Sequence, residues 1–291
     1  EKEITLRFLK ARKKDSFLNI ISIFSFIGIS LGVAVLIIVM SVMNGFRSEL
    51  INKIVGFNSH ITVDPYEKEI VVSDLKESNL SFISNDLILS NSGEAVIIQK
   101  DISKGIVLRG YSKTDFSKLR IVKDKTYKGD RNNLAKNFIS IGKELSFTLG
   151  LKIGDDITIM SSAGVETIIG SLPKKKRFTI ISLFESGIAD FDNNVAFINL
   201  DTLDELFNFT KKDRNLEIYL KKPQDIQNQK YIVEQLFPNE FVYSWADTNS
   251  SLFSALKVER NVMFIILSLI IIVAAFNIIS GLTILVKNKT R

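Results

Sequence analysis

The sequence predicts an α+β domain inserted between two transmembrane α-helices, which extend out of the membrane as stalk helices. Two long segments, 17–43 and 262–286, contain no charged residue. Stretches with helical apolar spacing adjoin them at 44–56 and 248–260. Between the stalks, strand-like and helix-like patterns mix without a regular β-α-β rhythm, which is typical of α+β domains.

Both uncharged segments are long enough to cross a membrane, since roughly 20 apolar residues span about 30 Å of hydrocarbon. The first is too long, and lies too far from a small-residue cleavage site, to be the core of a signal peptide. We therefore interpret it as a retained transmembrane helix. The predicted parts are an N-terminal segment at 1–16, a first span at 17–43, the stalks and α+β domain at 44–260, a second span at 261–286 and the start of a loop at 287–291.

Basic residues outside the two spans predict their orientation. They are Arg7, Lys10, Arg12, Lys13 and Lys14 before the first span, and Lys287, Lys289 and Arg291 after the second. Because basic residues accumulate on the cytoplasmic side, both ends are expected in the cytoplasm and the domain outside it. These residues supply part of the net charge of +6, so the charge requires no nucleic-acid partner. The chain has no cysteine, so apolar packing without disulfides must hold the domain together.

The first stalk passes from an apolar to an amphipathic pattern without a turn. The helix is apolar on every side before Asn44, whereas after Phe46 its charged residues lie on one face. Gly56 is predicted to end this helix, because glycine adopts the left-handed cap conformation readily.

The domain between the stalks is predicted to combine several strands with three helices. Strands are expected at 60–64, 94–101, 104–111, 138–142, 155–160, 177–184, 194–200, 215–220 and 240–245. A turn near Ile102 and Ser103 should join the second strand to the third. Helices are expected at 143–149, at 201–209 with Asp201 as its cap, and from Pro223 to Phe237. Polar residues dominate 114–137, which we interpret as a loop.

No motif in the chain predicts catalysis, a cofactor or a metal. There is no Gly-rich phosphate-binding motif, and one histidine without cysteine does not make a structural zinc site. His60 stands alone at the start of a strand, which makes it a poor candidate for a general base. Residues 190–201 resemble a calcium loop in their acidic spacing, but Val195 occupies the position that needs glycine. We therefore predict that the chain is not an enzyme.

Three residues in the spans are candidates for helix packing. Gly28 and Gly32 have the spacing that lets two helices approach closely, although glycine is also tolerated where a helix faces lipid. Asn277 is a polar residue within the second span, best explained by a hydrogen bond to another helix.

The segment 161–181 combines apolar residues with a cluster of basic ones. Gly164, Gly170 and Pro173 interrupt a hairpin-like run. One interpretation is a docking surface for a partner, with an apolar contact and a basic rim. The other is an ordinary long hairpin whose tip is solvated by lysines. The candidate docking residues are Ile168, Ile169, Leu172, Pro173, Lys174, Lys175, Lys176 and Arg177.

Two membrane motifs carry a resemblance to a known family. "FIGISLGVAVLIIVMSVMNGF" and "LFSALKVERNVMFIILSLIIIVAAFNIISGL" resemble the first two spans of the LolC and LolE permeases of the lipoprotein-releasing ABC transporter. "LGLKIGDDITI" is similar to a strand-entry turn in their periplasmic domain. The resemblance covers nearly the whole chain and implies a periplasmic core of the MacB type. It also implies two further spans after Arg291, so the sequence looks like the N-terminal portion of such a permease.

The resemblance implies a transport function in the bacterial inner membrane. Permeases of this family pair as homo- or heterodimers and rely on a separate subunit that binds ATP. They extract lipoproteins from the membrane and pass them to a soluble periplasmic carrier. The hairpin segment aligns with a hook-like loop that docks the carrier in LolC. Acyl chains are expected to enter beside the outer ends of the spans, at Met40, Met43, Phe46, Met263, Phe264 and Leu267.

Two other functions remain open from the sequence. One is a mechanotransmission efflux permease of the MacB type, which has the same membrane topology. The other is a two-span receptor whose periplasmic domain senses a ligand. A receptor predicts a signalling domain after Arg291, whereas a permease predicts further apolar spans.

Overall fold

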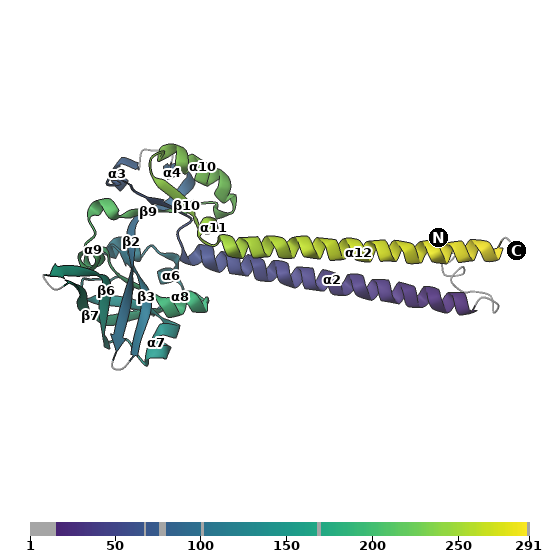
Figure 1. Ribbon diagram of the computed structural model, residues 1–291, viewed down its shortest axis with the longest axis horizontal. Helices are drawn as coiled ribbons and strands as arrows, with labels where there is room; N and C mark the ends of the chain where they lie inside the picture. Colours follow the sequence, from purple (N-terminus) through teal and green to yellow (C-terminus); the bar gives the residue numbers. More distant parts are fainter. Residues whose placement is uncertain (1–15, 67, 76–79, 100–101, 168–169, 290–291) are drawn as a thin grey trace. The chain divides into compact units, whose positions relative to one another are not determined.

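The computed structural model describes residues 16–66, 68–75, 80–99, 102–167 and 170–289 (Figure 1). The chain divides into two compact units. The first contains the described residues up to Glu49 together with those from Ser250 onward. The second is the domain at 50–249.

The first unit is built from two long helices. Helix α2 covers Ser16–Phe57 and helix α12 covers Ser250–Lys289. Within the described residues, both contain a segment long and apolar enough to cross a membrane. The start of α2 and the end of α12 lie at the same end of this unit, so the helices run antiparallel (Figure 1). The prediction of one unbroken helix over 17–56 is confirmed, because α2 covers all of these residues.

Each of these helices has one stripe that is less exposed than the rest. On α2 the stripe includes Leu36, which is buried, and half-buried Met40 and Met43. On α12 it includes Leu256, which is buried, and half-buried Met263. The spacing of three, four or seven residues is that of a helix-packing seam. We infer that the two stripes face each other within this unit.

The domain is organised around a closed ring of strands. The ring consists of β2 (Ser84–Gln99), β3 (Ile102–Tyr111), β8 (Val195–Asn199), β5 (Phe138–Gly142), β7 (Gly170–Phe184) and β6 (Asp156–Thr167), which returns to β2. Inward-facing residues alternate along each strand and form one core. This core includes Ile97, Ile106, Ile139, Ile159, Phe178, Ile180 and Ile198. Closure of the sheet lets the six strands bury a shared apolar interior without cysteine.

The sheet continues beyond the ring from the first half of β2. There β9 (Asn215–Leu220) pairs with β2, and β1 (Ile61–Asp64) lies between β9 and β10 (Phe241–Ser244). At the other end of the pairing order, β4 (Lys128–Gly129) pairs with β7. The shorter helices are α3 (Val72–Leu75), α4 (Leu80–Ile83), α5 (Lys113–Phe116), α6 (Arg120–Lys123), α7 (Lys143–Leu149), α8 (Ala189–Asn194), α9 (Leu200–Phe207), α10 (Ile226–Leu236) and α11 (Trp245–Thr248), with 3-10 turns at Lys211–Asp213 and Pro223–Asp225. The predicted α+β class is confirmed.

The interpretation of 114–137 as a loop was wrong in part. The segment contains most of α5, all of α6 and strand β4. Its few apolar residues are nearly all buried in a second core, next to the end of α2. They are Phe116, Leu119, Ile121, Val122, Tyr127 and Leu134. Such short helices have no long apolar period, so only the tertiary contacts reveal them.

Two predicted helix ends and one turn differ from the structure. Gly56 is helical, and α2 ends one residue later at Phe57, whose ring is buried in the second core. The cap of α9 is Asn199, whose side chain accepts a hydrogen bond from the backbone of Thr202, rather than Asp201. Ile102 and Ser103, predicted as a turn, belong to strand β3, and residues 100–101 before it lie outside the described residues.

Candidate functional site

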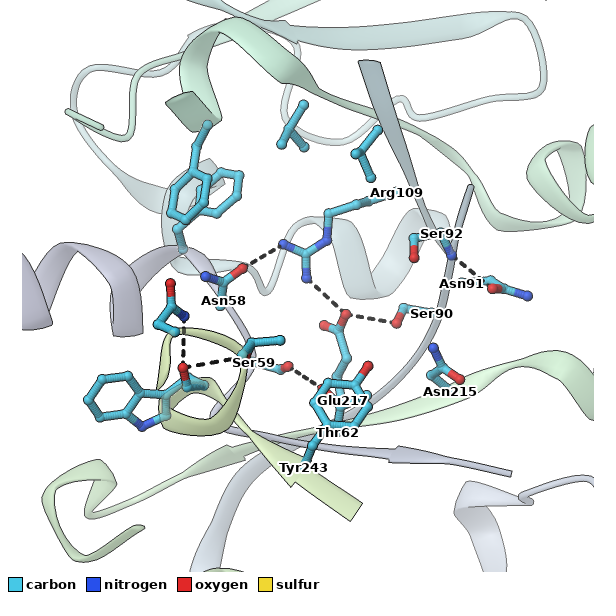
Figure 2. Close-up of a pocket in the computed structure, with 17 residues that line it drawn as sticks. Asn58, Ser59, Thr62, Ser90, Asn91, Ser92, Arg109, Asn215, Glu217 and Tyr243 are labelled. Atoms are coloured by element: carbon cyan, nitrogen blue, oxygen red, sulfur yellow. Dashed lines mark hydrogen bonds and ion pairs between the residues drawn. The ribbon is translucent and has the colours of Figure 1, made fainter. Parts of the chain in front are cut away.

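A cavity of about 360 Å³ lies within the domain (Figure 2). It is lined in part by the residues at which the domain follows α2 and precedes α12 in the chain. Its wall includes the last residue of α2 and the residue just before α12. The side chains come from α2, β1, β2, β3, α8, β8, β9, β10 and α11 and from the residues just after α2 and just before α12. The lining residues are Phe57, Asn58, Ser59, Thr62, Ser90, Asn91, Ser92, Val107, Arg109, Phe191, Val195, Asn215, Glu217, Tyr243, Trp245, Thr248 and Asn249.

A buried ion pair forms the polar centre of this cavity. Arg109 on β3 donates to Glu217 on β9 across 3.0 Å, and the side chains are 14% and 5% exposed. Glu217 also accepts from the Tyr111 hydroxyl at 3.0 Å, from Tyr219 at 2.8 Å and from Ser90 at 2.8 Å. Burial raises the pKa of Tyr111 and of Tyr219, so both phenols stay protonated and donate. The Glu217 carboxylate therefore has four hydrogen-bond donors inside the domain: Arg109, Tyr111, Tyr219 and Ser90.

The end of α2 is held by the same cluster. Asn58, the first residue after α2, accepts from the second arm of the Arg109 guanidinium at 3.3 Å. The guanidinium also lies 5.6 Å from the centre of the Phe57 ring, a cation–π arrangement. Phe57 stacks on Phe191 with ring centres 4.4 Å apart. Arg109 thus joins the sheet to Phe57 and Asn58, at the end of α2.

His60 has a structural role beside this cluster. Its ring is buried, and Nδ1 accepts a hydrogen bond from the backbone N–H of Leu220 at 2.7 Å. The backbone carbonyl of His60 accepts from the backbone N–H of Trp245 at 3.1 Å, at the start of α11. Burial lowers the pKa of His60 to about 4, so the ring is neutral at pH 7. These contacts explain the histidine as a connector between strands.

The stability of the domain is expected to fall between about pH 6.5 and pH 4 because of His60. The pKa is about 6.5 unfolded and about 4 folded, so the unfolded chain binds the extra proton in this range. The stabilisation is complete above pH 6.5 and is lost as the pH falls, by about 3 kcal/mol in total. Thermal unfolding of wild type and His60→Gln across this range would measure the loss. Since the chain has one histidine, an equal slope in both proteins would contradict the assignment.

The candidate docking segment is a long antiparallel hairpin made of β6 and β7. Leu172 is 57% exposed and Pro173 is exposed beside it. A hollow of about 650 Å³ next to Pro173 is lined in part by Met160, Val96 and Val107. Ile168 and Ile169 lie outside the described residues.

Part of the expected basic rim is engaged within the domain. Lys174 donates to the backbone carbonyl of Glu205 at 2.6 Å and to the side chain of Asn208, at the C-terminal end of α9. Lys176 forms an ion pair with the Glu205 carboxylate at 3.4 Å. Lys175 and Arg177 are exposed, and Arg177 lies 3.4 Å from Asp156. The lysines therefore brace the hairpin against α9 as well as adding positive charge to its surface.

The predicted membrane residues fall into two groups. Met40, Met43, Met263 and Leu267 are half-buried, whereas Phe46 and Phe264 are 58% and 67% exposed. Within the described residues, no atom of a neighbouring segment lies within 4 Å of the Cβ positions of Gly28 or Gly32. Asn277 lies in α12. Close packing at the two glycines would therefore need a helix from outside the described chain.

The calcium-like spacing at 190–201 forms α8, β8 and the start of α9. Asp192 is buried and accepts from the backbone N–H groups of Ser186 at 2.7 Å and Gly187 at 3.1 Å. It orders the turn before α8. Among the described residues there is no group of three or more metal-ligating side chains.

Comparison with known proteins identifies the family. Residues 22–234 match the family described as the MacB-like periplasmic core domain. The chain is 30% identical to the lipoprotein-releasing system transmembrane protein LolC of Neisseria meningitidis serogroup B, over 98% of this chain and 70% of that protein. This chain belongs to the LolC/LolE permease family. It is also 24% identical to LolE of Haemophilus influenzae, over 98% of this chain and 71% of that protein.

A solved structure can be compared with this LolC/LolE-family permease. The periplasmic region of MacB from Actinobacillus actinomycetemcomitans aligns with 69% of this chain and 95% of its own, with 10% identity and a TM-score of 0.41. The resemblance to the LolC/LolE family and the MacB-like fold class are confirmed by the family match. In this permease, two membrane-capable helices flank a periplasmic-type domain. The similarity to LolC supports a lipoprotein-releasing permease better than an efflux permease of the MacB type.

Sequence reasoning missed the buried ion pair of the LolC/LolE-family chain. Arg109 and Glu217 each stand among apolar residues of a strand, in "KGIVLRGY" and "NLEIYL". A charge at such a position signals either an outward-facing residue or a buried partner. Only the pairing of β3 and β9 to the same strand, β2, brings the two together.

Proposed function

We propose that this chain is the membrane permease subunit of an ABC transporter that extracts lipoproteins from the inner membrane. The similarity to LolC over 98% of the chain carries the proposal. Two helices long enough to cross a membrane support it, together with the MacB-like domain between them. The permease passes its cargo to a soluble carrier in the periplasm.

The orientation and the partner subunits belong to the same proposal. Both ends of the chain lie in the cytoplasm and the domain lies in the periplasm, which the basic residues outside the spans favour. A separate ATPase subunit binds ATP, and a second permease subunit pairs with this one. The open surface at Gly28 and Gly32 supports such pairing, since small residues allow a helix of another subunit to approach.

The lipoprotein acyl chains enter between the outer parts of α2 and α12. Met40, Met43 and Met263 lie on the half-buried stripes, where flexible thioethers adapt to an inserted chain. Phe46 and Phe264 are exposed and offer apolar surface at the edges. Opening the seam between the helices would uncover an apolar path, and among the described residues no ion pair joins the two helices.

The β6–β7 hairpin docks the carrier. Leu172 is 57% exposed, so its side chain is available for contact, and Pro173 restricts the backbone next to it. Lys174 and Lys176 hold the hairpin against α9, so little order has to be gained on binding. Exposed Lys175 and Arg177 then attract an acidic partner, chiefly by raising the association rate.

The substitution Leu172→Asp is expected to weaken carrier binding at least about 30-fold, because a charge replaces a central apolar contact. Its folding should be unaffected, since the side chain is exposed. The measurements are carrier binding by surface plasmon resonance, and lipoprotein release from proteoliposomes that contain the full-length permease and its ATPase.

Phe147→Asp is the matched control. Phe147 is a large apolar side chain that is 85% exposed and belongs to α7, not to the hairpin strands. This variant should bind the carrier like wild type. If Leu172→Asp also binds like wild type, the hairpin is not the docking surface. If the wild-type permease hydrolyses ATP but releases no lipoprotein, the proposed function itself is wrong.

A further inference from the structure

Several long side chains attach the root of α2, its last turn together with Asn58, to the rest of the domain. Phe57 stacks on Phe191 at the second core, and Asn58 accepts a hydrogen bond from Arg109. Lys53, one turn earlier, donates to the carbonyl of Gly187 at 3.4 Å. Among these, Arg109 contacts both the root of α2 and the centre of the sheet.

The two arms of the Arg109 guanidinium serve different partners. Nη2 donates to Glu217 at 3.0 Å, and Nη1 donates to Asn58 at 3.3 Å (Figure 2). Glu217 accepts three hydroxyl donors besides Arg109, and none of them comes from α2. A buried ion pair adds little net stability compared with apolar residues of the same volume. Its specific geometry at this place therefore suggests a mechanical role.

A continuous path of strand pairing leads from Arg109 to the hairpin. Arg109 on β3 lies opposite Ser92 on β2. Further along β2, residues 95–98 pair with residues 158–161 on β6. Strand β6 then forms the hairpin with β7, with one irregularity in the register between Met160 and Gly164. Strand pairing thus connects the cluster to Leu172, which lies opposite Val165 beyond this irregularity.

The root of α12 is built differently. Helix α11 ends at Thr248, and Asn249 has non-helical angles, φ −110° and ψ 30°, before α12 begins at Ser250. Helix α2, by contrast, runs without a break from Ser16 to Phe57. A helix without a break transmits displacement along its axis, whereas a bend at one residue can absorb it.

We propose that Arg109 is a positioning residue that makes the root of α2 and the sheet move as one body. It delivers displacement of α2 to the β6–β7 hairpin, and so couples ATP hydrolysis to cargo release. This inference rests on the proposed function of the chain. Asn58 is the partner on the stalk side, and Glu217 holds the guanidinium in place.

The test uses the full-length permease with its ATPase in proteoliposomes that contain an acylated lipoprotein. Asn58→Ala removes the oxygen that accepts the hydrogen bond from Arg109 Nη1 and leaves the Arg109–Glu217 pair intact. We expect its release per ATP hydrolysed to fall about fivefold or more, the lower range of a coupling between sites, with its melting temperature nearly unchanged. Asn58→Asp should keep the coupling, because its carboxylate still accepts from Arg109.

Arg109→Met should show the same loss of release per ATP, and Arg214→Met is its control. Arg214 is 15% exposed and pairs with Asp204 at 2.6 Å, within the domain and without a contact to α2. Both variants lose an ion pair of similar burial. An equal loss of coupling in Arg214→Met would mean that destabilisation, not positioning, explains the result, and would overturn the inference.

A second readout separates this inference from the proposed function. Spin labels at Arg47 on α2 and at Lys175 on the hairpin report the distance between them with and without ATP. We expect an ATP-dependent change in wild type and in Arg214→Met, and its loss in Asn58→Ala. An unaltered change in Asn58→Ala would refute the positioning role, whether or not lipoprotein is the cargo.

Discussion

Replacing Glu217 with alanine is expected to destabilise the domain by about 3–5 kcal/mol, because it leaves the charge of Arg109 buried without its partner. The side chain of Glu217 is 5% exposed, so water cannot replace it easily. The hydroxyl groups of Tyr111, Tyr219 and Ser90 also lose their acceptor. Each unsatisfied donor adds to the cost.

Urea unfolding of the detergent-purified chain, followed by tryptophan fluorescence, would measure this loss, because Trp245 lines the same cavity. Glu205→Ala is the control, since Glu205 pairs with Lys176 at the surface and is 70% exposed. Its effect should stay within about 0.5 kcal/mol. The double variant Arg109→Met with Glu217→Leu should be more stable than Glu217→Ala. If Glu217→Ala unfolds like wild type, the ion pair is not buried as described.

The second large effect is expected at Gly142, where α8 passes close to the end of β5. A Cβ on residue 142 would lie 2.0 Å from the backbone oxygen of Asp192. Backbone atoms cannot rotate away, and Asp192 is fixed by its bonds to Ser186 and Gly187. Gly142→Val should therefore cost about 3 kcal/mol, at the upper end for overpacking.

Gly105→Ala is the matched control for Gly142→Val. Gly105 lies on β3, and nothing is within 4 Å of its Cβ position. Alanine there should leave the unfolding midpoint nearly unchanged or raise it slightly. Hydrogen exchange would locate the effect, with Gly142→Val losing protection in β5 and α8 first. Equal stability of Gly142→Val and wild type would contradict the close approach of these elements.

Much of the candidate docking hairpin could be predicted from the sequence. The clustering of Leu172 with basic residues next to turn-forming glycines indicated an exposed hairpin, and Leu172 is exposed. The engagement of Lys174 with α9 could not be predicted. A lysine in a charged run has no local signal for a helix end that lies more than thirty residues later in the chain.

The sequence by itself determined the two membrane-capable helices, the α+β class and most of the strands. These features depend on local periodicity and on uncharged length, which are properties of neighbouring residues. The continuous helix through Asn44 and Phe46 is of this kind, and so is the helix at Lys143–Leu149.

Only the tertiary structure decided the closed ring of strands, the burial of His60 and the joining of Arg109 to Glu217 and Asn58. Each depends on contacts between residues far apart in the chain, separated by 160 positions for His60 and Leu220 and by 108 for Arg109 and Glu217. Whether a charged residue in a strand faces water or a buried partner is set by the strands beside it, and a single sequence does not state their order.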